Sequence, residues 1–244
     1  MSAIYGLVAK MRAVLSEKLG ALEEHFSKCS AKVDVAARVV DGRKTNVKIS
    51  KLWRQVTTSL CAIIIFDGKH RVGVVQHLMV AEYLAAQRNE EGTFVIWVAK
   101  HKLGDKRPAI VVLDAATAEF VDRYYLLRRK VDNVAVDNFF VTNTGHEVNK
   151  IFDLLTTAIR EKDFRYPDGD LVKVSGGWLR NQLETSAVDH GPAVAGQVAA
   201  ALQHTEDTAR RHYQMGSSTT AIRQHQAVVA VEQLKLMDEF ICAE

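Results

Sequence analysis

The chain has 244 residues, 48% of them hydrophobic, which is enough to bury the core of one full domain with an appendage. Its three cysteines (Cys29, Cys61 and Cys242) form no CxxC pair, which disfavours a disulfide framework and a zinc site, and no apolar run is long enough to span a membrane. The net charge of +3 tolerates a polyanionic partner without demonstrating one, and without a signal-peptide pattern the sequence predicts a soluble intracellular protein, nuclear if its source is eukaryotic.

Residues 2–28 are predicted to form one long helix. Apolar side chains recur there at three- and four-residue steps, which describes a single stripe along a helix. The stripe consists of Ile4, Leu7, Val8, Met11, Val14, Leu15, Leu19, Leu22 and Phe26. Its partner stays open, because such a helix can dock on the rest of the chain, on a second copy, or on an upstream part of the same protein.

A basic segment follows at 38–51, with five cations against one acid. The glycine in its middle indicates a linker or a turn. Arg43, Lys44 and Lys48 are candidates for contacts with phosphates, although a solvated basic loop explains them equally well.

Two predicted helices lead to the clearest β signal of the chain. Helical periodicity runs through 52–66 and stops at the sequence DG, and a shorter helix is expected over 74–86. Residues 93–114 contain two β-branched and aromatic runs separated by a polar connector with Gly104 and Pro108. This pattern predicts a β-hairpin with a basic tip.

The second half of the chain is predicted to be mainly helical. Asp114 suits the N-cap of a helix that follows it, a short strand is expected at 139–142, and the sequence NTG at 143–145 indicates a turn. Helices alternating with short loops are expected from there to the end. The predicted fold class is therefore α+β, mostly α-helical with a small antiparallel sheet or hairpin.

A few side chains have the chemistry of a catalytic site. Arg71 follows a helix end, lysines lie on the hairpin, Arg180 lies in GGWLRN, and His204 precedes Tyr213 by nine residues. Singly, each has an ordinary structural explanation, since surface arginines and hairpin lysines are common and a tyrosine ring often packs with its hydroxyl in water. Their order and spacing are more informative than any one of them.

Four sequence motifs carry a resemblance to a known family. KHRVGVVQHLMVAEY, around Arg71, is similar to the pattern GxRxxExxxLxxxD, and GGWLRN, around Arg180, is similar to the box HxxRH. LQHTEDTARRHYQM is similar to LGHSxxxTTxxYxH and aligns His204 and Tyr213. AKHKLGDKRPAIVVL resembles a lysine-bearing hairpin. Together they resemble the catalytic domain of the tyrosine recombinases, the phage-integrase superfamily, over residues 36–215.

The resemblance also suggests a branch of the family and a choice of lysine. Lys102 is the best match to the hairpin lysine, with Lys100 and Lys106 as alternatives. The hairpin and the sequence FFVTNTGHEV look most similar to the eukaryotic mobile-element branch, the Crypton-like recombinases.

A domain organisation follows from the resemblance. Residues 1–35 would be a helix left from an N-terminal core-binding domain, 36–215 the catalytic domain, and 216–244 a C-terminal helix that packs in cis or is exchanged between protomers. The implied partner is double-stranded DNA and the implied assembly is a homo-oligomer, a tetramer on two DNA sites, with no membrane partner. On this view the chain looks like a fragment or a truncated copy.

The implied activity is site-specific cleavage and rejoining of DNA strands. Arg71 and Arg180 would hold the phosphate with their guanidinium forks. Tyr213 would attack the phosphorus to form a 3′-phosphotyrosine, Lys102 would protonate the departing 5′ oxygen, and His204 would assist proton movement. Neither a cofactor nor a metal ion is expected, because the covalent link conserves the energy of the phosphodiester bond.

Three positions depart from the family pattern. Val74 stands in place of a glutamate, Gly177 in place of the histidine or lysine that comes three residues before Arg180, and Gln203 in place of a glycine. The loss at Val74 would affect the packing and orientation of Arg71 more than the chemistry.

Other functions remain as alternatives. The changes at Val74 and Gly177 favour a catalytically impaired DNA-binding module derived from a recombinase. A type IB topoisomerase has similar chemistry, and an unrelated α+β protein could match the motifs by coincidence. Lys106, Arg210 and Arg211 are further candidates for DNA contacts, the two arginines being equally compatible with a solvated helix face.

Overall fold

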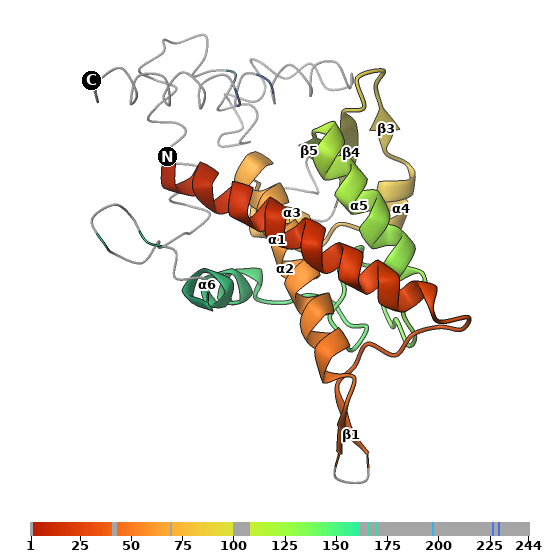
Figure 1. The fold of residues 1–244 in the computed structure, drawn as a ribbon. Coiled ribbons are helices and arrows are strands. Elements are labelled where there is room, and N and C mark those ends of the chain that lie inside the picture. Colours follow the sequence, from red (N-terminus) through yellow and green to blue (C-terminus); the bar gives the residue numbers. More distant parts are fainter. Residues whose placement is uncertain are drawn as a thin grey trace.

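The structure is a computed structural model that describes residues 2–40, 43–68, 70–99 and 108–161, with the isolated positions 165, 169, 197, 226 and 229. In chain order the elements are α1 (Ser2–Ser27), β1 (Arg38–Val40), β2 (Arg43–Thr45), α2 (Val47–Gly68), α3 (Val72–Gln76), α4 (Val80–Leu84), β3 (Gln87–Arg88), β4 (Phe94–Val98), β5 (Ala109–Leu113), α5 (Ala115–Arg128) and α6 (Ile151–Glu161). Helices pack around a small antiparallel sheet (Figure 1), which confirms the predicted α+β class.

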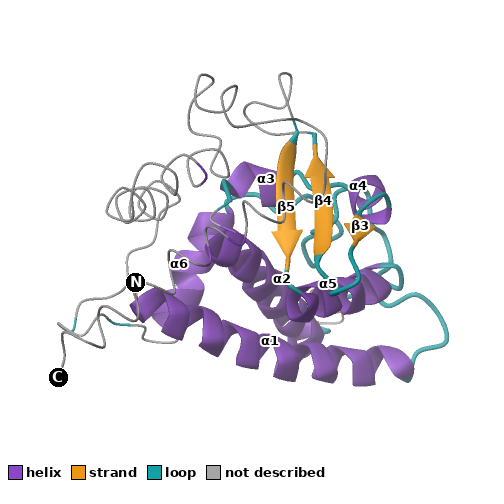
Figure 2. Cartoon of the chain, turned by 90° about the horizontal axis from the view of Figure 1, so that it is seen from above, coloured by secondary structure: helices purple, strands orange, loops and turns teal. Residues whose placement is uncertain are grey.

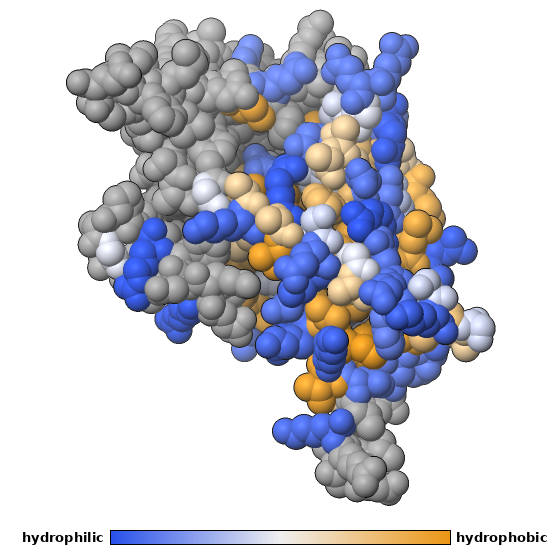
Figure 3. Space-filling view, viewed as in Figure 1, coloured by the Kyte–Doolittle hydropathy of each residue, from blue (hydrophilic) through white to orange (hydrophobic). Residues whose placement is uncertain are grey.

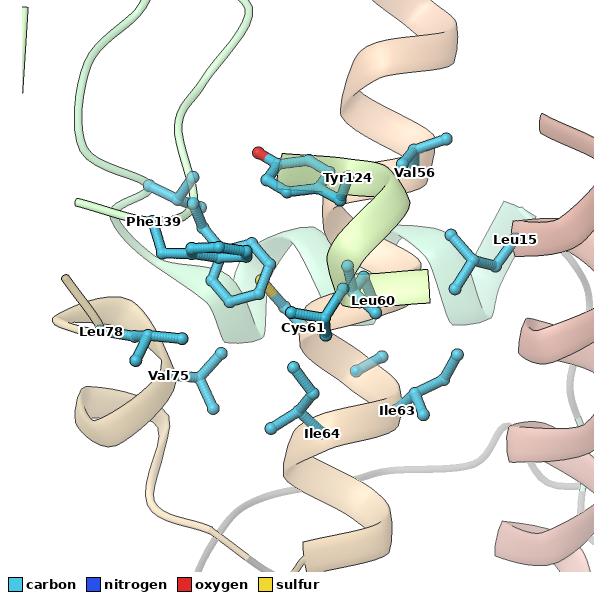
Figure 4. Packing of buried hydrophobic residues seen from close by; sticks show 14 of the residues in the cluster. Leu15, Val56, Leu60, Cys61, Ile63, Ile64, Val75, Leu78, Tyr124 and Phe139 are labelled. Carbon is cyan, nitrogen blue, oxygen red and sulfur yellow. The ribbon is translucent and has the colours of Figure 1, made fainter. Parts of the chain in front are cut away.

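Helix α2 lies at the centre of the described fold. From Val56 to Phe66 its residues are buried, apart from the half-buried Ser59. Helices α1, α3, α5 and α6 and strand β5 all contact it. Figure 4 shows Cys61 and Ile64 of α2 pointing towards the side chains of α3 and of the segment after it. A helix that is apolar on nearly every side has to be enclosed in this way.

Helix α1 packs its apolar stripe against α2 and α5 of the same chain. The stripe residues that the structure describes as buried are Val8, Met11, Leu15, Leu19, Leu22 and Phe26. The ring of Phe26 stacks on that of Trp53 in α2, with centroids 6.3 Å apart and planes 11° apart. The sequence left three docking partners open for this helix, and in the structure it docks on the rest of its own chain. The domain boundary at residue 35 stays a prediction.

Two sets of ion pairs hold α1 in register with its neighbours. The Arg123 guanidinium of α5 donates to both carboxylate oxygens of Glu23, each at 2.7 Å. On the other side, Arg12 Nη2 donates to Asp67 at 2.6 Å and to Asp114 at 3.0 Å. Because these groups are partly exposed, the pairs orient the helix more than they stabilise it.

The three-stranded sheet has the order β3–β4–β5 and is antiparallel throughout. Phe94 of β4 lies opposite Leu113 of β5, and Val98 lies opposite Ala109, which confirms the two strands of the predicted hairpin. In Figure 2, α2 and α5 lie between α1 and this sheet, in agreement with the contacts of both helices with β5. The fold therefore has three layers.

The basic segment at 38–51, expected to be a linker or a turn, forms a hairpin followed by the start of a helix. Strands β1 and β2 form an antiparallel hairpin in which Arg38 lies opposite Thr45, and α2 begins directly after it. Asn46, with φ at 57°, redirects the chain between β2 and α2. The sequence contains the physical reason, because a two-residue Asp–Gly connection between extended runs is a strong hairpin signal.

The single helix predicted over 74–86 is wrong, because the structure has α3 and α4 with a break between them. The backbone at the break bonds to a distant segment: Phe139 N donates to the Leu78 carbonyl at 2.7 Å, and Val80 N donates to the Asp137 carbonyl at 2.9 Å. Tertiary hydrogen bonds therefore end the first helix, and local periodicity carries no sign of them.

The strand predicted at 139–142 is also wrong. Of these residues, Val141 alone forms an isolated bridge, with Glu147, and the two phenylalanines before it are fully buried core residues. The aromatic run anchors an irregular segment instead of extending a sheet. The predicted turn is confirmed, since Gly145 has φ at 77° and its N–H donates to the Thr142 carbonyl at 3.1 Å.

Asp114 is the N-cap of α5, as the sequence predicts. Its carboxylate accepts the Thr117 backbone N–H at 2.6 Å. Partial burial opposes the charged carboxylate, but the hydrogen bonds from Thr117 and the charge of Arg12 outweigh it and lower the pKa of Asp114. The same carboxylate thus begins α5 and ties it to α1.

A buried polar cluster joins α2, α5 and the segment before the turn. Trp53 Nε1 donates to the Val141 carbonyl at 2.9 Å. The Tyr124 hydroxyl accepts hydrogen bonds from Thr57 Oγ1 and from Val141 N, both at 3.3 Å. Both backbone polar groups of Val141 are therefore satisfied inside an apolar core, where an unpaired group would be costly.

The described surface carries few large apolar side chains. Val47, Leu84 and Leu126 are exposed, each on a different helix. On the face drawn in Figure 3, hydrophilic residues cover most of the described surface, with smaller apolar areas between them. No helix among the described residues is long and apolar enough to cross a membrane.

Tyr124→Phe is expected to lower the free energy of unfolding by about 1–3 kcal/mol, because it leaves the buried Val141 N–H without an acceptor. Urea denaturation of the full chain measures the loss. Tyr125→Phe is the matched control, since the neighbouring hydroxyl makes no hydrogen bond within the described residues; it should change stability by less than about 0.5 kcal/mol. Equal losses in the two variants would contradict the role of Tyr124.

Candidate functional site

Of the predicted catalytic residues, Arg71 is the one that the described part of the chain contains. Helix α2 ends at Gly68, and Arg71 is the N-cap residue of α3, with extended dihedral angles (φ −67°, ψ 140°). Its carbonyl accepts the Val74 N–H at 2.9 Å. The backbone of Arg71 is therefore fixed at both sides, by the end of a buried helix and by the first turn of the next.

Helix α2 ends at a glycine. The His70 backbone N–H donates to the Ile65 carbonyl at 3.1 Å, which folds the chain back over the last turn of the helix. A Cβ at position 68 would overlap the His70 imidazole ring. Gly68 thus leaves room for the present position of the ring that precedes Arg71, and a larger residue would make that ring rotate away.

The Arg71 side chain is half-buried, and its Nε has no hydrogen-bond acceptor within the described residues. Other half-buried arginines of the fold are paired: Arg128 donates to the carbonyls of Val136 and Asn138 at 2.7–3.0 Å, and Arg123 binds Glu23. A buried donor without a partner costs about 1–3 kcal/mol. The donor at Arg71 is therefore available for an acceptor from outside the fold.

Val74 occupies the position where the family pattern has a glutamate. Its side chain is 3% exposed and belongs to the hydrophobic core. An apolar residue offers Arg71 no acceptor, and a carboxylate at this place would need a partner of its own in the core. Valine therefore fits this buried position without a polar partner, and it leaves the arginine without an internal carboxylate from this position.

Helix α3 is held in place from its other end. His77 Nδ1 lies 2.9 Å from Glu147 Oε1, and Gln76 Nε2 donates to Asn149 Oδ1 at 3.0 Å. The Gln76 carbonyl also accepts a hydrogen bond from the Asn138 side chain at 3.2 Å. These contacts join the short helix to the segment that surrounds the turn at Gly145, so the element that follows Arg71 is rigidly supported.

The sheet contributes the strands that flank the predicted lysine. The last pair of the β4–β5 ladder is Val98 and Ala109, and the connection between them contains Lys100, Lys102 and Lys106. These three lysines lie outside the described residues. Figures 1 and 2 both draw α3, the helix that begins after Arg71, on the β5 side of the sheet.

Some of the other predicted site residues are described by the structure, and the rest lie outside the described residues. Lys44 and Lys48 are exposed on β2 and α2, and Arg43 belongs to β2. The predicted residues outside the described part of the chain are Arg180, His204, Arg210, Arg211 and Tyr213, together with Gly177 and Gln203. Their grouping around Arg71 stays a prediction.

Sequence reasoning missed two cations on α2. Lys51 and Arg54 are exposed on the same helix as Lys48, at successive three-residue steps. The signal was present in the i, i+3 spacing, which places side chains on one helix face.

Among the described residues there is no group of three or more His, Cys, Asp or Glu side chains that could hold a metal ion.

Comparisons with solved structures find similar folds, among them those of two recombinases. No protein-family model and no curated protein sequence matches the chain. The fold is similar to the XerH site-specific recombinase bound to its difH substrate in a pre-cleavage complex, with a TM-score of 0.46 and 17% identity over 83% of this chain. It is similar to the XerA recombinase with a TM-score of 0.42 and 17% identity over 72% of this chain. The chain covers 50% of XerH and 61% of XerA.

Arg71→Met should leave the free energy of unfolding unchanged or raise it by up to about 1 kcal/mol, because methionine keeps an apolar stem and removes a buried donor without an acceptor. Urea denaturation tests this. Arg123→Met is the control that removes a paired guanidinium, and it should lower stability by about 0.5–1 kcal/mol. A loss at Arg71 as large as that at Arg123 would reveal an internal partner for Arg71.

Proposed function

We propose that the protein cleaves and rejoins DNA strands through a 3′-phosphotyrosine intermediate, as a tyrosine recombinase. The observation that carries the proposal is the state of Arg71. Its backbone lies between the end of α2 and the start of α3, and its side-chain Nε is buried without an acceptor in the described residues. A phosphate oxygen is the acceptor that a guanidinium fork matches best.

The order of the sequence motifs supports the same chemistry. Arg71 is followed by a hairpin with Lys102, then by Arg180, and then by His204 and Tyr213 at a nine-residue separation. The β4 and β5 strands on either side of the lysine-bearing connection pair in the register of a hairpin. A chance match would have to reproduce both this order and the hairpin.

The reaction assigns one task to each group. Tyr213 loses its hydroxyl proton with the assistance of His204 and its oxygen attacks the phosphorus, the bond from phosphorus to the 5′ oxygen breaks, and Lys102 gives that oxygen its proton. Arg71 and Arg180 neutralise the charge that grows on the phosphate, which makes each worth about a hundredfold or more in rate. A 5′ hydroxyl then attacks the phosphotyrosine, with His204 assisting proton movement, and tyrosine is released.

The finer assignments belong to the same proposal. The partner is double-stranded DNA, and the protein acts as a homo-oligomer, a tetramer on two sites, in which residues 216–244 form a helix exchanged between protomers. Its relatives are the Crypton-like recombinases of eukaryotic mobile elements, which implies a nuclear location. Residues 1–35 descend from a core-binding domain, and 36–215 form the catalytic domain.

A non-catalytic DNA-binding module is a second candidate, favoured by one observation. Val74 is buried in the core in place of the acidic residue of the family pattern, so Arg71 lacks a carboxylate from that position. A protein that no longer cleaves DNA can retain this arrangement, because phosphate binding needs the guanidinium but not its precise orientation.

A covalent trapping experiment separates the two candidates. The full chain is incubated with a pool of duplexes nicked beside potential cleavage sites, so that the short 5′-hydroxyl fragment diffuses away and the protein stays attached. We expect an adduct that resists denaturation with the native chain and with Tyr125→Phe, and none with Tyr213→Phe. Arg71→Met should form the adduct at a rate that is lower by about a hundredfold or more.

Two results would count against catalysis by Tyr213. An adduct that persists in Tyr213→Phe would assign the nucleophile to another residue. Binding to the pool without any adduct, for the native chain as for Tyr213→Phe, would establish the binding module instead.

A further inference from the structure

Four exposed cations gather where the β1–β2 hairpin meets α2. Lys48, Lys51 and Arg54 follow one another at three-residue steps on α2, and Lys44 lies on β2 just before it. All four side chains are exposed, whereas the opposite side of this part of α2 is buried through Trp53 and Val56. We call Lys44, Lys48, Lys51 and Arg54 the basic face.

The charge of the basic face is not neutralised. Within the part of the chain that the structure describes, none of the four cations has an ion-pair partner. Glu24 of α1 interacts with the charge of Lys48, and it is already bound to Lys28 at 2.6 Å. The hydrogen bond from Lys28 lowers the pKa of Glu24 first, and the charge of Lys48 adds a weaker effect. The surroundings therefore leave a net positive surface.

The position of these cations is unfavourable for α2 itself. A helix N-terminus carries partial positive charge, and a cation there costs about 0.3–1 kcal/mol. Lys48 lies in the first turn of α2, which contains no acidic residue, and Lys51 begins the second. An anion held against this face would relieve the repulsion.

The hairpin extends the surface away from the body of the protein. In Figure 1 the β1–β2 hairpin projects beyond the start of α2, clear of the other described elements. Its strands contain Arg38, Arg43 and Lys44, of which Lys44 is exposed. Lys44 on this projecting ribbon adds its charge to the three cations at the start of α2, and a chain of phosphates is a linear array of negative charge that such a group of cations can contact.

We propose that the basic face binds the phosphate backbone of double-stranded DNA at a place separate from the phosphate held by Arg71. The choice of DNA as the polyanion rests on the proposed function, whereas the location of the surface rests on the exposed and unpaired cations. Contacts of this kind position the protein on a duplex and do not read its sequence.

One rigid helix relates the basic face to Arg71. From Lys51 to Gly68 the axis of α2 rises by about 26 Å, at 1.5 Å for each residue. This length corresponds to about eight base pairs of duplex, at 3.4 Å for each phosphate of a strand. The separation of the two places is thus shorter than the duplex used below, so the length of the DNA does not prevent contact with both.

The salt dependence of binding tests the basic face. A fluorescent 30-base-pair duplex is titrated with the full chain at several KCl concentrations, for the native protein and for Lys48→Gln/Lys51→Gln/Arg54→Gln. Each lost phosphate contact should reduce the slope of log K against log salt by about 0.9, so the triple variant should lose up to about 2.7 from the slope. Affinity at low salt should fall at least tenfold, equally for unrelated duplex sequences.

Two control variants make the result specific. Lys130→Gln/Lys150→Gln/Arg160→Gln removes the same charge from exposed cations on other elements and should leave the slope close to that of the native protein. Lys48→Arg/Lys51→Arg keeps the charge and should preserve the slope. Because all these side chains are exposed, urea denaturation should give similar stabilities throughout.

The outcomes separate this inference from the proposed function. An unchanged slope in the glutamine triple variant, or an equal loss in the control triple variant, overturns the basic face even if the covalent adduct forms. A reduced slope confined to the basic-face variant supports it, including the case in which no adduct forms and the recombinase proposal fails. Absence of any binding to duplex DNA by the native chain overturns both.

Discussion

The burial of α2 is the constraint on which the rest of the described structure depends. Half of its 22 residues are buried, and from Val56 onwards almost no side of the helix can face water. The elements that contact α2 are positioned by covering it: α1 on one side, α5 and the sheet on another, and α3 and α6 near its end. Exposure is confined to the start of the helix, where the cations lie, and to its end, where the chain turns towards Arg71.

Most of the polar groups described in this core have hydrogen-bond partners, and the exception at Arg71 lies in the candidate site. Where the fold must be rigid, polar atoms are satisfied: Trp53 and Tyr124 together bind both backbone groups of Val141, and Arg128 binds two carbonyls. Arg71 is the contrast, since its Nε is buried without an acceptor in the described residues. Among the described residues, the partly buried guanidinium groups of Arg12, Arg123 and Arg128 are satisfied, whereas the donor at Arg71 carries a cost in stability that a bound anion would offset.

Sequence reasoning succeeded where the signal is local. The stripe of α1, the two strands of the β4–β5 hairpin, the Asp114 cap and the turn at Gly145 each depend on residues close together in the chain. It failed where distant partners decide, as at Leu78, whose carbonyl is taken by a backbone N–H from the segment after α5. In the candidate site, the place of Arg71 after a helix end was predictable from sequence, but the hydrogen-bonding state of its guanidinium depends on neighbours that no spacing reveals.

The sequence by itself determined the helix over 2–28, the two strands of the β4–β5 hairpin, the Asp114 cap and the turn at Gly145, because periodicity, capping and turn chemistry act over a few residues. Only the tertiary structure decided that α1 docks on its own chain, that 74–86 divides into two helices, and that Val74 joins the core three residues after Arg71, whose Nε has no acceptor among the described residues. The physical reason is that burial and backbone hydrogen bonding depend on which distant segments meet. The same holds for the basic face, whose cations were visible in the sequence, whereas their lack of an ion-pair partner within the described residues was not.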